Sequence, residues 1–335
     1  MSRQSLNLIL LAGGASTERP VSKMSSKGIY EALISLGHKV AVVDPAYGKL
    51  QPENVGDFFE EKDLFKISPA NYVEAVNLPA FANADSVVIG LHGRWGEDGT
   101  LQSLLELKGL NYTGSGVLAS SVCMDKGMAK IIFSDNGVSV PAGFVVQRGS
   151  YALEEVKKKI KKEFGYPLVV KPNDQGSTFG LSVCEDESAI RQAMELAFSY
   201  SDKVLVEKFI AGRELTVGVL EHRSLTPLEI RPKHELYDYE CKYTKGMSEY
   251  LVPAPVDEAT ANKLKEQALL AYNATGCRGY ARVDFRLAPD GETYCMELNT
   301  LPGMTPTSLL PKMAKAENIP FEELIDKIVN VSLAR

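Results

Sequence analysis

The chain has 335 residues, of which 44% are hydrophobic and 24% are charged, and its formal net charge is −6. This length allows two or three domains with cores of their own, and the negative balance lacks the basic excess expected of a nucleic-acid-binding protein. No apolar run approaches the ~18 residues of a membrane-spanning helix and the N-terminus does not resemble a signal peptide, so we expect a cytoplasmic protein without a membrane partner.

Strands and helices alternate along the first third of the chain. Three apolar runs predict buried strands: 6–14 (LNLILLAGG), 38–44 (HKVAVVD) and 85–93 (DSVVIGLHG). Apolar residues at helical spacing predict a helix over 21–36 that ends at Gly37. We therefore expect an open parallel α/β domain over 1–120, with a binding site between the strand ends Gly13-Gly14 and His92-Gly93.

The middle of the chain predicts a second α/β unit, which we expect to span 121–207. Its predicted elements are a helical stretch at 117–137, a strand at 143–147, a helix at 151–163 and a strand at 166–172. The lysine run at 157–164 has acidic neighbours on the same helix, so it predicts a solvated face rather than a nucleic-acid patch.

Strands dominate from about residue 203 onward. The predicted strands are 204–210 (VLVEKFI), 213–220 (RELTVGVL) and a hairpin within 279–299, and the predicted helices cover 257–275 and 320–333. This pattern predicts a third unit, of α+β type, over 208–335. The fold class expected for the whole chain is α/β with α+β.

The predicted hairpin places two carboxylates opposite each other. If Asp290-Gly291 is a two-residue turn, Asp284 faces Glu297, and Arg282 and Asn299 share their face of the sheet. The other face then carries the apolar residues Val283, Phe285, Leu287, Tyr294, Met296 and Leu298. Opposed like charges require a cation between them, and two carboxylates with an amide suit magnesium. A polar sheet face neutralised by Arg282 explains the pattern equally well.

The segment 173–180 (NDQGSTFG) predicts a phosphate-binding loop, because Gly176, Ser177, Thr178 and Gly180 can present N–H and hydroxyl groups to an anion. A plain surface turn explains the glycines equally well. Lys171, at the end of an apolar strand, favours the first interpretation, since a lysine there needs an anion and nucleotide phosphate is the obvious one.

Two further segments combine a glycine with polar groups. In 301–309 (LPGMTPTSL), the Gly303 N–H can approach an oxyanion, and Ser308 with the Leu309 N–H can bind a carboxylate at a helix start. Helix capping by Ser308 is compatible with this role. In 206–220, the edge at Glu207, Lys208 and Ile210 and the nearby Glu214 can bind adenine and ribose, although a routine strand–turn–strand is the simpler interpretation.

Together these segments resemble the ATP-grasp superfamily and, within it, the D-alanine–D-alanine ligases. The motifs that carry the resemblance include HGRWGEDGT (92–100), YTGSG (112–116), ELYDYECKY (235–243) and ELNTLPGMTPTSL (297–309), in the order of that family. The resemblance implies a three-domain ATP-grasp fold in which two domains clasp ATP. It also implies ATP-dependent joining of two D-alanines through a D-alanyl phosphate, for peptidoglycan precursor synthesis by a cytoplasmic homodimer.

The resemblance also implies roles for individual residues. Asp284, Glu297 and Asn299 match ligands of two Mg²⁺ or Mn²⁺ ions, and a monovalent cation is left open. The nucleotide residues are Lys126, Lys171 and Lys242 at the phosphates, Glu207, Lys208 and Ile210 at adenine, and Glu214 at ribose. Arg282 and the Gly303 N–H match groups that stabilise the phosphoryl and tetrahedral oxyanions.

The remaining implied roles concern the amino-acid substrates. Glu18 holds the first ammonium group and forms a hydrogen-bonded set with Ser177 and Tyr243, while Ser308, Leu309 and His92 belong to the substrate-binding residues. Tyr243, which the D-lactate-using relatives lack, favours an amine acceptor. The family usually has histidine after its glutamate, whereas this chain has Arg19, so we expect an added positive charge near the first ammonium site.

Two other functions are consistent with these motifs. One is an ATP-grasp ligase that makes another dipeptide or depsipeptide, such as D-Ala-D-Ser or D-Ala-D-lactate. The other is a nucleotide-binding regulator without ligase activity, against which the complete set of Lys171, Arg282, Asp284, Glu297 and Asn299 argues, because a regulator needs no transition-state donors.

Overall fold

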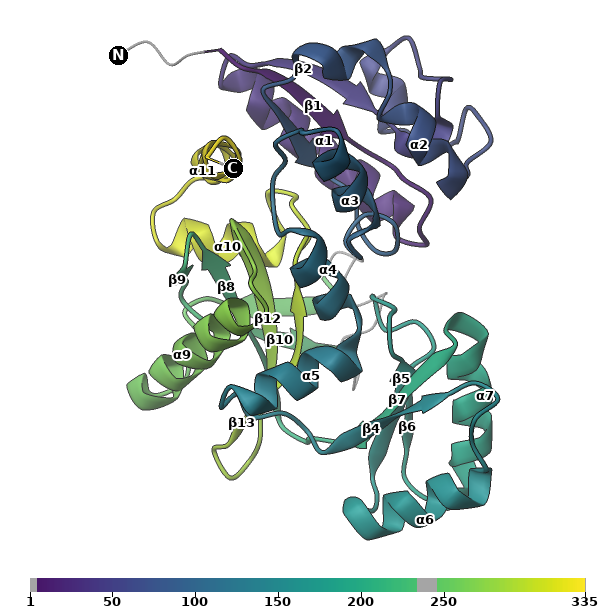
Figure 1. Cartoon of the computed structure of the whole chain (residues 1–335). Coiled ribbons are helices and arrows are strands. Elements are labelled where there is room, and N and C mark those ends of the chain that lie inside the picture. The colour runs from purple at the N-terminus through teal and green to yellow at the C-terminus, as the bar shows by residue number, and fades with distance from the viewer. Residues whose placement is uncertain (1–4, 234–245, 335) are drawn as a thin grey trace.

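The computed structural model describes residues 5–233 and 246–334, which form three sheets with flanking helices (Figure 1). The N-terminal sheet is parallel, with the strand order β2-β1-β3. Its elements are β1 (Asn7–Leu11), β2 (Lys39–Val43) and β3 (Ser86–Ile89), with α1 (Arg19–Ser35), α2 (Tyr72–Ala75) and α3 (Thr100–Leu107). Short 3₁₀ helices cover Pro45–Tyr47, Val55–Phe58, Pro69–Asn71 and Pro79–Asn83. The central strand β1 is apolar because helices and loops cover both of its faces.

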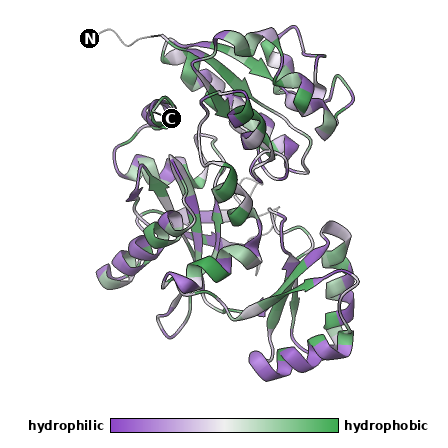
Figure 2. Ribbon diagram, viewed as in Figure 1, coloured by the Kyte–Doolittle hydropathy of each residue, from purple (hydrophilic) through white to green (hydrophobic). Residues whose placement is uncertain are grey.

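The central sheet is antiparallel, with the order β4-β7-β5-β6. It comprises β4 (Gly143–Gln147), β5 (Leu168–Pro172), β6 (Ser182–Cys184) and β7 (Lys203–Lys208), with α6 (Leu153–Glu163), the 3₁₀ turn Glu187–Ala189 and α7 (Ile190–Tyr200). Helix α6 buries only Val156 and Ile160, and the purple colour of the rest of it in Figure 2 marks its hydrophilic face. The prediction of a solvated lysine face is confirmed.

The third sheet has the order β11-β10-β8-β12-β13, and β9 pairs with β8. Its strands are β8 (Arg213–Leu220), β9 (Arg223–Ser224), β10 (Leu228–Pro232), β11 (Ser248–Leu251), β12 (Tyr280–Leu287) and β13 (Thr293–Asn299). The helices α4 (Val117–Met124), α5 (Lys126–Asp135) and α9 (Glu258–Ala274) cover one face of it through a shared apolar core. The other face of β12 and β13 is therefore left to polar residues.

The last two helices link the third sheet to the first. Helix α10 (Leu309–Ala316) packs on β8, and α11 (Phe321–Ser332) packs on α1 and β3. Leu324 and Ile328 of α11 share one core with Leu8 of β1, and the Ser332 and Ser86 hydroxyls lie 2.7 Å apart. No described helix is long and apolar enough to cross a membrane. The predicted domain boundaries at residues 120 and 207 stay a prediction.

The helix predicted over 117–137 is two helices. Asp125 separates them, because its backbone is extended (φ −81°, ψ 94°) and its carboxylate accepts a hydrogen bond of 3.0 Å from the Met128 N–H. Asp125 is thus the N-cap of α5, a role that aspartate often takes. The break aims the first turn of α5, with Lys126, toward the loop 173–180.

The hairpin contains two irregularities that cancel. The connection is Pro289-Asp290-Gly291 rather than a two-residue turn, since the Ala288 N–H donates to the Glu292 carbonyl over 2.8 Å and Gly291 has a φ of +86°. An odd loop alone would move Glu297 to the face opposite Asp284. A bulge between Asp284 and Phe285 restores the predicted Asp284–Glu297 and Arg282–Asn299 pairs.

The bulge also corrects the predicted faces of β13. Beyond it, Phe285 pairs with Cys295 and Leu287 with Thr293, each one residue away from the predicted partner. Thr293 and Cys295 therefore point into the core, whereas Tyr294 and Met296, expected on the apolar face, are only partly buried. Both Met296 and Glu297 consequently reach the polar side of the sheet.

Candidate active site

Two adjoining pockets meet on the polar face of β12 and β13. The first pocket lies between the loop 173–180 and the sheet, and its lining includes Lys126, Lys171, Glu214, Asp284 and Met296. The second pocket extends toward the N-terminal sheet, and its lining includes Glu18, His92, Asn299, Gly303, Ser308 and Leu309. Four residues line both pockets: Gly176, Ser177, Arg282 and Glu297. A molecule in one pocket thus lies next to a molecule in the other.

The opposed carboxylates are neutralised by side chains of the protein. Arg282 donates two hydrogen bonds of 2.8 Å to Asp284, which also accepts bonds from Thr216 (2.6 Å) and from the Asn299 amide (3.1 Å). Glu297 lies 3.2 Å from the Lys126 ammonium group. Of the two explanations of this polar face, a bound cation and neutralisation by Arg282, the structure contains the second. Asp284, Glu297 and Asn299 are nevertheless oxygen donors of the kind that Mg²⁺ prefers, on one face of one hairpin.

Glu207 is fully buried on β7, and its carboxylate lies between two lysines. Lys171 of β5 approaches one oxygen to 2.6 Å and Lys130 of α5 approaches the other to 2.7 Å. Burial alone would raise the pKa of Glu207, but the two ammonium groups hold it below its ordinary value. The anion that faces Lys171 is thus a carboxylate of the protein, although Lys171 also lines the first pocket.

The loop 173–180 is tied to the N-terminal unit. Ser177 donates a hydrogen bond of 2.5 Å to the Glu18 carboxylate, and the Lys126 ammonium group donates to the Gln175 carbonyl over 2.8 Å. Ser177 and Thr178 have positive φ angles of 52° and 65°, which side-chain-bearing residues rarely adopt. A Cβ on Gly176 would lie 2.8 Å from the Glu18 carboxylate, so a larger residue there would displace that carboxylate or the loop. The predicted pair of Glu18 and Ser177 is thus in contact.

A hydrogen-bond chain through His92 holds the segment around Gly303. Its Nδ1 lies 2.8 Å from the Leu301 carbonyl and its Nε2 lies 2.9 Å from the Ser25 hydroxyl. A carbonyl can only accept, so Nδ1 carries the proton and Nε2 accepts from Ser25. Ser25 in turn accepts from the Met304 N–H over 3.2 Å. Burial lowers the pKa of His92, against the opposing effect of Glu18, which is consistent with a neutral ring.

The start of α10 borders the second pocket. Ser308 occupies the N-cap position, but its hydroxyl accepts from the Thr305 N–H over 3.0 Å instead of capping its own helix. Ser308 and Leu309 both line the pocket. The helix start, where the first N–H groups have no partner within the helix and the dipole is positive, can bind a carboxylate there.

Three residues of the site carried no individual prediction. Lys130 and Ser25 lie one turn and two turns along their helices from Lys126 and Glu18, so helical spacing could have revealed them. The third, Glu97, lines the second pocket within HGRWGEDGT. Burial raises the pKa of Glu97 to about 8, and the neighbouring Glu18 and Glu297 add to this effect.

Some predicted residues lie apart from the two pockets. Glu207, Lys208 and Ile210, predicted at adenine, are outside both linings, with Lys208 exposed and Ile210 buried. Lys242 and Tyr243 lie outside the described residues. The prediction that Arg19 adds a positive charge near the ammonium site is wrong. Its guanidinium is paired with Asp44 at 2.7 Å and with Asp63 at 2.8 Å, so the charge is compensated.

Known proteins resemble this chain over its whole length. Family models described as D-ala D-ala ligase N-terminus and C-terminus match residues 7–115 and 132–330. The D-alanine–D-alanine ligase of Halalkalibacterium halodurans is 42% identical, with 98% of this chain and 100% of the relative covered. The D-alanine–D-alanine ligase of Bacillus anthracis complexed with ATP has a TM-score of 0.79 at 29% identity, with 98% of each chain covered. VanG D-Ala:D-Ser ligase from Enterococcus faecalis has a TM-score of 0.81 at 29% identity, with 98% of this chain and 100% of that chain covered.

Proposed function

The chain belongs to the D-alanine–D-alanine ligase family, and from this premise we propose that it joins two D-alanines in an ATP-dependent reaction through a D-alanyl phosphate. The observation that carries the proposal is the meeting of the two pockets at Arg282 and Glu297. A nucleotide in the first pocket would end where an amino acid in the second begins. A phosphoryl group can pass directly from the nucleotide to the amino acid only if the two molecules lie next to each other.

In the first step, a carboxylate oxygen of the first D-alanine attacks the γ-phosphorus of ATP, and ADP leaves. Glu18 binds the ammonium group of that D-alanine, and Lys126 and Lys171 neutralise phosphate oxygens. Arg282 lies on the boundary between the pockets, where negative charge develops on the transferred group. Asp284, Glu297 and Asn299 would hold Mg²⁺ or Mn²⁺, two ions in our proposal, which would neutralise the phosphates further.

In the second step, the amine of the second D-alanine, having lost a proton, attacks the acyl phosphate carbonyl, and inorganic phosphate leaves. The Gly303 N–H stabilises the tetrahedral oxyanion, supported by the Ser25–His92 hydrogen bonds that hold residues 301–304. Ser308 and the Leu309 N–H at the start of α10 bind the carboxylate of the second D-alanine.

A coupled assay of ADP release tests the proposal. We expect release that depends on both D-alanine and Mg²⁺, with D-alanyl-D-alanine as the product seen by mass spectrometry. Binding of ATP without turnover would instead indicate a nucleotide-binding regulator. From family membership we also propose a cytoplasmic homodimer, which light scattering and cell fractionation would test.

The choice of acceptor needs its own test, because the likeness to a D-Ala:D-Ser ligase matches that to a D-Ala–D-Ala ligase. We propose D-alanine as the preferred acceptor, since curated relatives at 42% identity are D-alanine–D-alanine ligases. Competition between D-alanine, D-serine and D-lactate at equal concentration would decide it. A dominant D-serine or D-lactate product would contradict the choice.

A further inference from the structure

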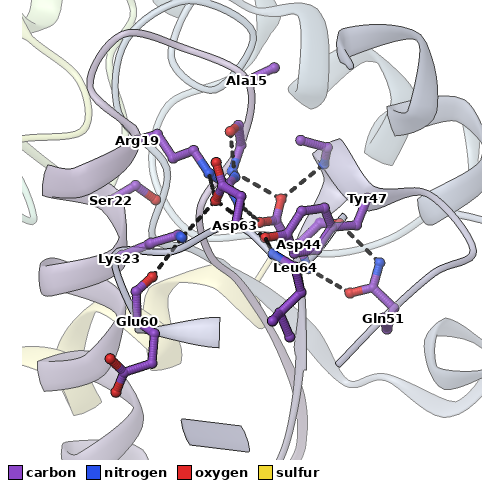
Figure 3. Close-up of polar contacts among 12 residues, drawn as sticks. Ala15, Arg19, Ser22, Lys23, Asp44, Tyr47, Gln51, Glu60, Asp63 and Leu64 are labelled. Atoms are coloured by element: carbon purple, nitrogen blue, oxygen red, sulfur yellow. Dashed lines mark hydrogen bonds and ion pairs between the residues drawn. The ribbon is translucent and has the colours of Figure 1, made fainter. Parts of the chain in front are cut away.

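Arg19 lies in the first turn of α1, directly after Glu18, and its guanidinium is buried among acceptors (Figure 3). Nε lies 2.8 Å from Asp63, one terminal nitrogen lies 2.7 Å from Asp44, and the other donates to the Gly14 carbonyl over 2.6 Å. Three separate segments of the N-terminal unit thus meet on one side chain.

Arg19 and Asp44 together form a clamp on Gly14, in which Arg19 binds its carbonyl and Asp44 binds its N–H. The other oxygen of Asp44 accepts from the Gly14 N–H over 3.1 Å and from the Ala46 N–H over 3.0 Å. The N–H and the carbonyl of Gly14 are therefore both held by the Arg19–Asp44 pair. The neighbouring Gly13 has a φ of +77°, and a Cβ there would lie 2.2 Å from the Asp44 carboxylate. The backbone at Gly13 therefore lies in direct contact with the Arg19–Asp44 pair.

The clamp joins the two ends of the loop 14–19, which contains Glu18. Residues 14 and 19 are joined through the guanidinium, and Glu18 lies between them. Inside the loop, the Glu18 N–H donates to the Ser16 hydroxyl over 3.1 Å, and Ser16 donates to the His92 carbonyl over 2.6 Å. The Glu18 backbone is thus fixed from two sides, while its carboxylate points to Ser177 and the second pocket.

The charges of the cluster balance. Asp63 also accepts from Lys23 over 2.8 Å and from the Tyr47 hydroxyl over 3.2 Å, so the cations of Arg19 and Lys23 are paired with the carboxylates of Asp44 and Asp63 (Figure 3). Lys23 also donates to the Glu60 carbonyl over 2.7 Å, which anchors the segment before Asp63. Arg19 can therefore organise the loop while its charge stays compensated.

We infer that Arg19 is a positioning residue for Glu18: its pairing with Asp44 sets the loop geometry that delivers the Glu18 carboxylate to the ammonium group of the first substrate. The inference rests on the proposed role of Glu18. Lysine at position 19 would keep the charge but lose the planar fork that holds Asp44, Asp63 and Gly14 together.

The test compares Arg19→Lys and the charge-balanced double variant Arg19→Met/Asp44→Asn with Glu18→Gln. Hydroxylamine replaces the second substrate and traps the D-alanyl phosphate as a hydroxamate, so the assay reports the first half-reaction. We expect both Arg19 variants to raise the KM for D-alanine about tenfold or more. The KM for ATP should stay close to that of the unaltered protein, whereas the melting temperature of Arg19→Lys should fall, because the buried acceptors Asp44, Asp63 and the Gly14 carbonyl lose donors.

The outcomes separate the two claims. If Glu18→Gln raises the KM for D-alanine and a folded Arg19 variant does not, the clamp is wrong and the role of Glu18 stands. If Glu18→Gln leaves that KM unchanged, the role of Glu18 is wrong, and the inference about Arg19 falls with it. A parallel rise in the KM for ATP would indicate general damage and would also overturn the positioning role.

Discussion

The Lys130 ammonium group lies 2.7 Å from the Glu207 carboxylate inside the protein, on the side opposite Lys171. Both residues are almost completely buried, and burial lowers the pKa of Lys130 against the opposing effect of Glu207. Lys130 thus compensates a carboxylate that would otherwise depend on Lys171, a lysine of the first pocket.

Replacing Lys130 by methionine should weaken both folding and ATP binding. Loss of one partner from a buried ion pair costs about 3–5 kcal/mol, and the second lysine on Glu207 should keep the loss near the lower end. Lys171 would then be held more strongly by Glu207 and less by phosphate. Urea unfolding and ATP titration check this; Lys130→Arg, which keeps the charge, should lose less of both.

Glu297→Gln should raise the Mg²⁺ concentration needed for half-maximal rate and slow turnover by about a hundredfold or more, because a neutral amide is a poorer ligand for a hard divalent ion. A Mg²⁺ titration of the initial rate measures it. Glu292→Gln is a matched control, since Glu292 is exposed in the same hairpin and pairs with Lys263 at 2.7 Å. Normal turnover of Glu297→Gln at low Mg²⁺ would exclude the ligand role.

Gly176→Ala should impair use of the first D-alanine. The new Cβ would lie 2.8 Å from the Glu18 carboxylate, and this contact would displace either Glu18 or the loop 173–180. We expect the KM for D-alanine to rise about tenfold, measured from initial rates at saturating ATP. Gly56→Ala is the control, because no atom lies within 4 Å of the Cβ position there. Equal kinetics for the two variants would contradict the close contact.

Stability should fall with decreasing pH because of His92. Its pKa is lowered by burial, so the unfolded chain, with an ordinary value of about 6.5, takes up the proton before the folded protein does. The free energy of unfolding should therefore decrease as the pH falls below about 6.5 and continue to decrease until the folded pKa is passed. His92→Gln should flatten this slope in urea titrations at several pH values, and the exposed His222→Gln should not.

Much of the fold followed from local patterns. The alternation of Val283, Asp284 and Phe285 places one side chain in the core and the next outside it, and this period of two is a property of any strand. Most predicted strand and helix positions and the pairing of Asp284 with Glu297 are confirmed, although the helix predicted over 117–137 is two helices. The α/β with α+β class is confirmed as well. The family resemblance rests on equally local motifs.

The partners of the charged residues depended on the tertiary structure. The sequence indicated that Lys171 needs an anion and that Arg19 adds a positive charge, but Glu207, Asp44 and Asp63 come from segments far along the chain. The pairing of Asp284 with Glu297 was predicted from a two-residue turn, yet it depends on a three-residue loop and a bulge that compensate each other. Periodicity determines which face a side chain occupies, because that depends on backbone geometry alone. The atoms that the side chain contacts depend on how distant segments of the chain pack together. A local sequence pattern does not contain that information.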